Sequence, residues 1–278
     1  MPPKSNIVSS QWLKDNIEQP KLIVLYTQMG NPLSGKADSS PAGYIPNSIF
    51  FDFEKVFCNA DSNLPHTMPT EINFTGGVQK LGIDHDSIIV IYDNKGIYCA
   101  PRVWWMFKSM GHHNVYVLNG GLPNWLAQGM PTVPQLVSPN KSGDFQGNYK
   151  SKFFINTDKI IQLLTSITLL DARSVGRFNG TQAEPREGLR SGHIPTSISL
   201  PFALCLEGTQ LKPASQLKVI FSECIPTTSD RFLVFSCGSG VTACILALAA
   251  TEAGYTEMAV YDGSWSEWGA SMDLPVEL

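Results

Sequence analysis

The most constraining feature of this chain is an internal repeat. The segment AGYIPNSIFF (residues 42–51) resembles SGHIPTSISL (residues 191–200), and the offset from Gly43 to Gly192 is 149 residues. Farther on, SIIVIYDNKGIYCAPR aligns without a gap on RFLVFSCGSGVTACIL, with an offset of 144 residues from Gly96 to Gly240. Because matched landmarks recur in the same order, we expect two domains of one architecture.

Each copy alternates short apolar runs with helical patterns. LIVLYT and IIVIY in the first copy, and TLLDAR and LVFS in the second, are predicted strands. Continuous β-branched runs separated by helices are typical of a parallel sheet that is covered on both faces. We therefore predict an α/β fold with two tandem domains, residues 1–132 and 153–278. Residues 133–152 are rich in Pro, Ser, Gly and Asn, which indicates a linker.

Composition narrows the classes of function. A formal net charge of −4 lacks the basic surplus that is typical of proteins that bind nucleic acid. The apolar runs are shorter than the ~20 residues of a membrane helix, and the first ten residues hold no hydrophobic signal core. We expect a cytoplasmic protein with small-molecule partners. Six cysteines without a CxxC pair argue against a disulfide framework and a zinc site.

The two copies differ in their chemistry at one position. Asp93 aligns with Cys237, so only the second copy can form a thiolate there, and we predict that the first domain is catalytically inactive. Cys237 follows a predicted strand and precedes Gly-Ser-Gly and a helix expected near Val241. This places the sulfur at the carboxyl edge of a parallel sheet, where open α/β sheets bind ligands. Backbone N–H groups of the loop and of the helix amino end favour an anionic sulfur.

A cysteine within such a loop is also typical of protein phosphatases. Their loop needs an arginine six residues after the cysteine to clamp the phosphoryl group, and that position here is Ala243. Without a guanidinium there is no bidentate partner for phosphate. We therefore disfavour phosphate-ester hydrolysis.

The motifs CGSGVTAC, SGHIPTSISLPF, GIYCAPRVWWMFKSMGHHNVYVLNGGLPNW and VYDGSWSEWG resemble those of tandem rhodanese-like sulfurtransferases, in the 3-mercaptopyruvate sulfurtransferase branch. The resemblance spans nearly the whole chain. It implies that Cys237 accepts sulfur from 3-mercaptopyruvate as a persulfide and releases pyruvate. The persulfide then passes sulfur to cyanide or to a thiol, with thioredoxin as a candidate acceptor. No metal or organic cofactor is implied.

The resemblance also implies residues that bind the substrate. Two arginines of the family grip the 2-oxo acid, and Arg177 in GRF and Arg186 in EPR match them. A guanidinium suits this role because its fork pairs a carboxylate through two bonds. In the thiosulfate-preferring branch, the active loop resembles CRKGVT and has two basic residues where this chain has Gly238 and Ser239. The uncharged loop of this chain therefore favours 3-mercaptopyruvate. Further expected contacts of the loop are Gly240, Val241 and Thr242.

By the same resemblance, the first domain supplies the far wall of the cleft. His66 is expected across from the active loop, and Tyr98 is expected to line the pocket. Relatives carry an acidic residue eight positions before this histidine, where this chain has Cys58. Asp61 is then the candidate acid for a Ser-His-Asp relay with Ser239 and His66. Alternatively, His66 hydrogen-bonds only to the backbone of the loop.

Two alternatives to this function stay open. One is a thiosulfate sulfurtransferase, and the other is a persulfide-carrying module that delivers sulfur to one partner protein. The sequence leaves the acceptor, the biological role and the oligomeric state undetermined.

Overall fold

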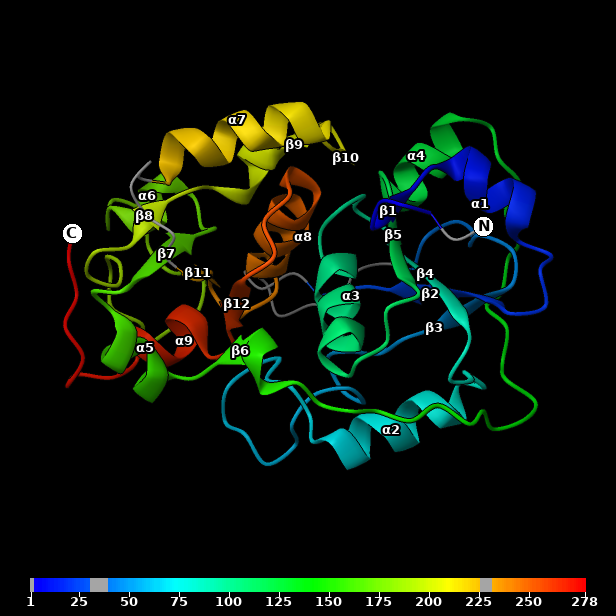
Figure 1. Cartoon of the computed structure of the whole chain (residues 1–278), viewed down its shortest axis with the longest axis horizontal. Helices are drawn as coiled ribbons and strands as arrows, with labels where there is room; N and C mark the ends of the chain where they lie inside the picture. The colour runs from blue at the N-terminus through cyan, green and yellow to red at the C-terminus, as the bar shows by residue number, and fades with distance from the viewer. Residues whose placement is uncertain (1–2, 31–39, 226–231) are drawn as a thin grey trace.

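The computed structural model describes residues 3–30, 40–225 and 232–278, and it contains two parallel five-stranded sheets (Figure 1). The strands of the first sheet have the order β1-β5-β4-β2-β3, and those of the second have the order β6-β12-β11-β7-β8. The first sheet consists of β1 (Ile7–Val8), β2 (Leu22–Thr27), β3 (Ser48–Phe50), β4 (Ile88–Asp93) and β5 (Val115–Leu118). The second consists of β6 (Phe154–Ile155), β7 (Ile167–Asp171), β8 (Ile198–Ser199), β11 (Phe232–Ser236) and β12 (Met258–Tyr261).

The two sheets are topological copies of each other. Counted along the chain, the same strand occupies the same place in both, and all pairs within them are parallel. The central strand of the first sheet, β4, ends at Asp93, and that of the second, β11, ends at Ser236, directly before Cys237. The predicted fold class is confirmed.

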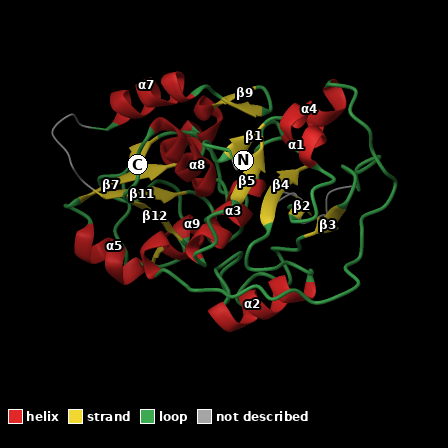
Figure 2. Ribbon diagram, turned by 45° about the vertical axis from the view of Figure 1, so that its right-hand side comes forward, coloured by secondary structure: helices red, strands yellow, loops and turns green. Residues whose placement is uncertain are grey.

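Helices cover both faces of each sheet (Figure 2). In the first domain these are α1 (Ser10–Asn16), α2 (Glu71–Lys80), α3 (Ala100–Ser109) and α4 (Gly121–Ala127). The second domain contains α5 (Thr157–Leu163), α6 (Val175–Phe178), α7 (Ala214–Cys224), α8 (Ala243–Ala253) and α9 (Ser264–Trp268), with short 3-10 turns η1 (Ser151–Phe153) and η2 (Phe202–Cys205). An antiparallel hairpin of β9 (Leu206–Glu207) and β10 (Gln210–Leu211) completes this domain.

One hydrophobic core runs through both domains. It joins α3 of the first domain to α8 of the second, which lie side by side at the centre of the molecule (Figure 1). The first eight residues of α8 are all buried, which explains why this helix is apolar all round rather than amphipathic. It ends at Gly254, whose φ of 100° is left-handed and costs glycine little.

Residues 133–150 run from one domain to the other along the surface of the first. The carbonyl of Gln79 in α2 and those of Ser109 and Met110 at the end of α3 accept hydrogen bonds from the amides of Gly143, Lys150 and Asn148. This segment is therefore held against the first domain instead of spanning open space. None of the described helices is long and apolar enough to cross a membrane.

Candidate active site

The loop between β11 and α8 positions Cys237 at the carboxyl edge of the second sheet. Ser264 Oγ accepts the amides of Cys237 at 3.2 Å and Gly240 at 3.1 Å, and Ser266 Oγ donates to the carbonyl of Gly238 at 2.6 Å. Gly240 has a φ of +72°, and a Cβ there would lie 2.8 Å from the carbonyl oxygen of Asp262. Only glycine fits this turn without displacing its neighbours. The helix begins at Ala243, two residues later than predicted.

The equivalent loop of the first domain, which follows Asp93, shows which kind of group a loop at this position can bind. Asp93 Oδ2 accepts the amides of Tyr98, Cys99 and Ala100 at 2.8 to 2.9 Å, and Oδ1 accepts the amide of Lys95 at 2.9 Å. The loop thus holds an anion with four backbone N–H groups. Because Cys237 takes the place of Asp93 in the repeat, we infer that its loop is likewise suited to an anionic sulfur.

Cys237 lines a cavity of about 180 Å³ between the two domains. The first domain contributes Met29 and Tyr98 to its wall, and the second contributes Phe202 and the active loop. The predicted residues that share this cavity are Tyr98, Arg177, Arg186, Cys237, Gly238, Ser239, Val241 and Thr242. Gly240 does not line it and instead shapes the turn behind it.

Arg186 is the cation of this cavity that is not neutralised by an acid. Within the described part of the chain it forms no ion pair, and its Nη2 donates a long hydrogen bond of 3.5 Å to Ser239 Oγ. Burial lowers the pKa of Arg186, an effect that nearby Cys237 opposes. A desolvated guanidinium gains strongly from an incoming carboxylate.

Arg177 lies in the same wall, but its fork is occupied. Its Nε and Nη2 donate to the carboxylate of Glu184 at 3.1 and 2.6 Å, and Glu184 also accepts from Arg173. Arg177 approaches the active loop so closely that a Cβ on Gly238 would lie 3.0 Å from its Nη2. The structure thus brings Arg177 to the site with its charge already paired.

His66 reaches the active loop from the first domain. Its Nδ1 lies 3.0 Å from Ser239 Oγ, and its Nε2 lies 3.3 Å from Glu54 Oε1. The acid against His66 is therefore Glu54, and this corrects the sequence-based candidate Asp61. The Asp61 side chain is exposed and makes no contact with His66 among the described residues. Glu54 precedes His66 by twelve residues, whereas the resemblance predicted an acid eight residues before this histidine.

Arg102 is a residue of this site that the sequence analysis missed. Its guanidinium is fully buried and donates to Asp262 Oδ1 at 2.7 Å, to the carbonyl of His66 at 2.6 Å and to that of Gly240 at 3.3 Å. It thereby ties the active loop and Asp262 of the second domain to the His66 segment of the first. The available signal was a charge within the otherwise apolar first eight residues of α3, APRVWWMF.

Comparison with known proteins agrees with this architecture. The family described as "Rhodanese-like domain" matches residues 9–128 and 156–271. The chain is 33% identical to the 3-mercaptopyruvate sulfurtransferase of Escherichia coli, covering 97% of both chains, and 38% identical to the thiosulfate sulfurtransferase of Rattus norvegicus, covering 94% of this chain and 91% of the relative. It is 37% identical to the mitochondrial thiosulfate/3-mercaptopyruvate sulfurtransferase 1 of Arabidopsis thaliana, covering 98% of this chain and 78% of the relative.

Solved structures also match over nearly the full length of both chains. The 3-mercaptopyruvate sulfurtransferase SseA of Escherichia coli superposes with a TM-score of 0.82 at 29% identity, covering 95% of this chain and all of the other. Tum1 of Saccharomyces cerevisiae gives a TM-score of 0.84 at 30% identity, covering 96% and 95% of the two chains. The paired sheets, the cysteine loop and these similarities lead to one conclusion: the chain belongs to the rhodanese-like family and contains two copies of its domain.

Proposed function

We propose that this protein is a sulfurtransferase that moves sulfur from 3-mercaptopyruvate through a Cys237 persulfide to a thiol acceptor. One observation carries the proposal: Cys237, in a loop suited to an anion, shares a small cavity with the acid-free guanidinium of Arg186. A donor that bears both a sulfur and a carboxylate would place one group at each of these residues.

The chemistry is a double displacement. The Cys237 thiolate attacks the sulfur of 3-mercaptopyruvate, so that an S–S bond forms and the C–S bond breaks. The bonding electrons leave on pyruvate as its enolate, which takes up a proton, and the positive charge of Arg186 stabilises the enolate. An acceptor thiolate then attacks the outer sulfur, forms its own persulfide and releases the Cys237 thiolate.

The group of Ser239, His66 and Glu54 would orient the donor. Ser239 Oγ lies between Arg186 Nη2 and His66 Nδ1, so its hydroxyl is held at the cavity wall by both domains. In this position it would hydrogen-bond to the bound donor, while Glu54 fixes the ring of His66. In this proposal Glu54 is a positioning residue, because it contacts His66 rather than the reacting atoms.

The site favours 3-mercaptopyruvate over thiosulfate as the donor. The Cβ of a side chain at position 238 would lie 3.0 Å from Arg177 Nη2, and a basic side chain there would meet a like charge, so Gly238 suits the present arrangement. The names of the relatives include both donors. The test is a comparison of kcat/KM for the two donors with cyanide as the common acceptor. We expect a preference for 3-mercaptopyruvate, and a preference for thiosulfate would refute the assignment.

Thioredoxin is our proposed protein acceptor, and the cytoplasm is our proposed compartment. After treatment with 3-mercaptopyruvate, mass spectrometry should find one added sulfur, about 32 Da, on the peptide of Cys237. Reduced thioredoxin and small thiols should both remove it. Persistence of this sulfur until another partner protein is added would instead support a persulfide carrier. Fractionation of cells followed by immunoblotting tests the compartment.

A further inference from the structure

A second cavity lies at the seam between the domains, at the edge opposite Cys237. It occupies about 390 Å³, within the range typical of small-molecule sites, and shares no lining residue with the Cys237 cavity. His113 precedes β5 and Glu257 precedes β12, so both lie at the amino edges of their sheets. Cys237 follows the carboxyl end of β11 instead. This cavity is therefore separate from the proposed active site.

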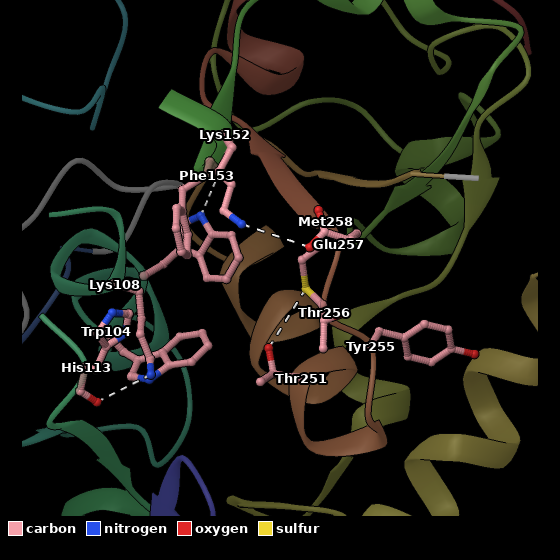
Figure 3. A pocket seen from close by; sticks show the side chains of 11 residues that line it. Trp104, Lys108, His113, Lys152, Phe153, Thr251, Tyr255, Thr256, Glu257 and Met258 are labelled. Carbon is pink, nitrogen blue, oxygen red and sulfur yellow. Dashed lines mark hydrogen bonds and ion pairs between the residues drawn. The ribbon is translucent and has the colours of Figure 1, made fainter. Parts of the chain in front are cut away.

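The walls of this cavity are aromatic and preformed. Trp104 of α3 belongs to the first domain, and Phe153 and Met258 belong to the second (Figure 3). Trp105 of α3 also lines the cavity. Trp105 packs edge-on against Phe153 with ring centroids 4.8 Å apart, and its Nε1 donates to the carbonyl of Phe153 at 2.9 Å. This contact fixes both rings before any ligand binds. Walls of this kind suit a flat apolar molecule.

The donor that this cavity offers to a ligand is Lys108, which lies beside an indole whose own N–H is buried and, within the described ranges of the chain, unpaired. Trp104 Nε1 is buried without a hydrogen-bond partner among the described residues, although buried indole N–H groups normally have one. Lys108 is half-buried and forms no ion pair in that part of the chain. Its Nζ reaches only the carbonyl of His113 at 3.4 Å and lies 5.8 Å from the ring of Trp104.

The electrostatics of Lys108 favour the approach of an anion. Burial lowers the pKa of Lys108, and the charge of Glu252 opposes this effect. The carboxylate of Glu252 is itself bound by Ser5 and by the backbone and side chain of Asn6. The other lysine of the cavity, Lys152, is already 4.0 Å from Glu257. Lys108 is thus the cation that an incoming negative group would neutralise.

We propose that this cavity binds a small aromatic anion, an aryl carboxylate of one or two rings. The ring lies among the side chains of Trp104, Trp105 and Met258, and the carboxylate accepts from the Lys108 ammonium. A ligand here contacts both domains, so binding stabilises their association and raises the temperature of unfolding.

Isothermal titration calorimetry with 2-naphthoate tests the proposal, with neutral 2-naphthamide as the matched ligand. We expect 2-naphthoate to bind at least about tenfold more tightly than the amide, a difference that corresponds to one good charge-assisted contact. Lys108→Met should abolish the difference, and Lys108→Arg should retain it. Lys14→Met, which removes an exposed lysine of α1, is the control and should leave both affinities unchanged.

Several results would overturn the proposal. These are no heat of binding up to millimolar 2-naphthoate, equal affinities for the acid and the amide, or unchanged binding in Lys108→Met with its fold intact by circular dichroism. Arg186→Ala distinguishes the two cavities, because loss of 2-naphthoate binding in that variant would place the ligand beside Cys237. None of these measurements uses sulfur transfer, so they stand apart from the proposed function.

Discussion

Replacing Glu54 by Gln tests whether this residue acts on the reaction through His66. The substitution keeps the shape and removes the charge that lies 3.3 Å from His66 Nε2. A charge-assisted hydrogen bond contributes about 1.5–3 kcal/mol when buried, whereas an exposed ion pair contributes about 0–1 kcal/mol. The side chain of Glu54 is 33% exposed and that of His66 is 10% exposed. We therefore expect a loss of about 1–2 kcal/mol, or roughly 5–30-fold in kcat/KM.

The assay is steady-state pyruvate release from 3-mercaptopyruvate, and Asp61→Asn is the matched control. This control alters an exposed acid of the same segment and should change kcat/KM by less than about twofold. Because Glu54 is argued to act through His66 and Ser239, Glu54→Gln should add little in a Ser239→Ala background. Independent, multiplying effects of the two substitutions, or an equal loss in Asp61→Asn, would refute this reasoning.

Three further predictions follow from buried groups. Arg102→Met removes the ion-pair partner of Asp262, which should cost about 3–5 kcal/mol in the free energy of unfolding measured with urea. Arg186→Ala should raise KM for 3-mercaptopyruvate about 10–150-fold, through loss of about 1.5–3 kcal/mol. The increase should exceed that of Arg177→Ala, because the fork of Arg177 is bound to Glu184. Burial raises the pKa of Cys205 and Cys244 to about 12, so at pH 8 both should escape iodoacetamide in peptide maps.

Features that repeat along the chain could be predicted from the sequence. The gapless alignment at an offset of 144 residues predicted equivalent positions for Asp93 and Cys237, and the first ends the central strand of its sheet while the second directly follows it. Apolar runs without alternation predicted parallel strands with two covered faces, which both sheets have. These features are local in sequence or are related by one fixed shift, so a pattern in the residues is sufficient to find them.

The contacts between the domains could not be predicted in this way. His66 meets Ser239 across 173 residues of sequence, and Arg102 meets Gly240 across 138. Neither of these separations in sequence follows from the repeat, because the two partners of each contact occupy non-equivalent positions in the two copies. The choice of Glu54 over Asp61 likewise depends on how the chain after β3 folds back toward His66. A spacing taken from relatives fails to identify the acid beside His66 where the loop between the two residues differs in length.

The two domains use their equivalent sheet edges in opposite ways. In the first domain the carboxylate of Asp93 permanently fills the ring of backbone amides. The β9–β10 hairpin of the second domain closes this edge, because Thr209 packs on Gly96 and the amide of Leu211 donates to Asn119 Oδ1 at 2.8 Å. In the second domain the corresponding position is Cys237, and a cavity reaches its loop. Exchange of a fixed anion for a thiol at one turn therefore accompanies a closed edge in one copy and an edge open to a cavity in the other, where we propose that sulfur transfer takes place.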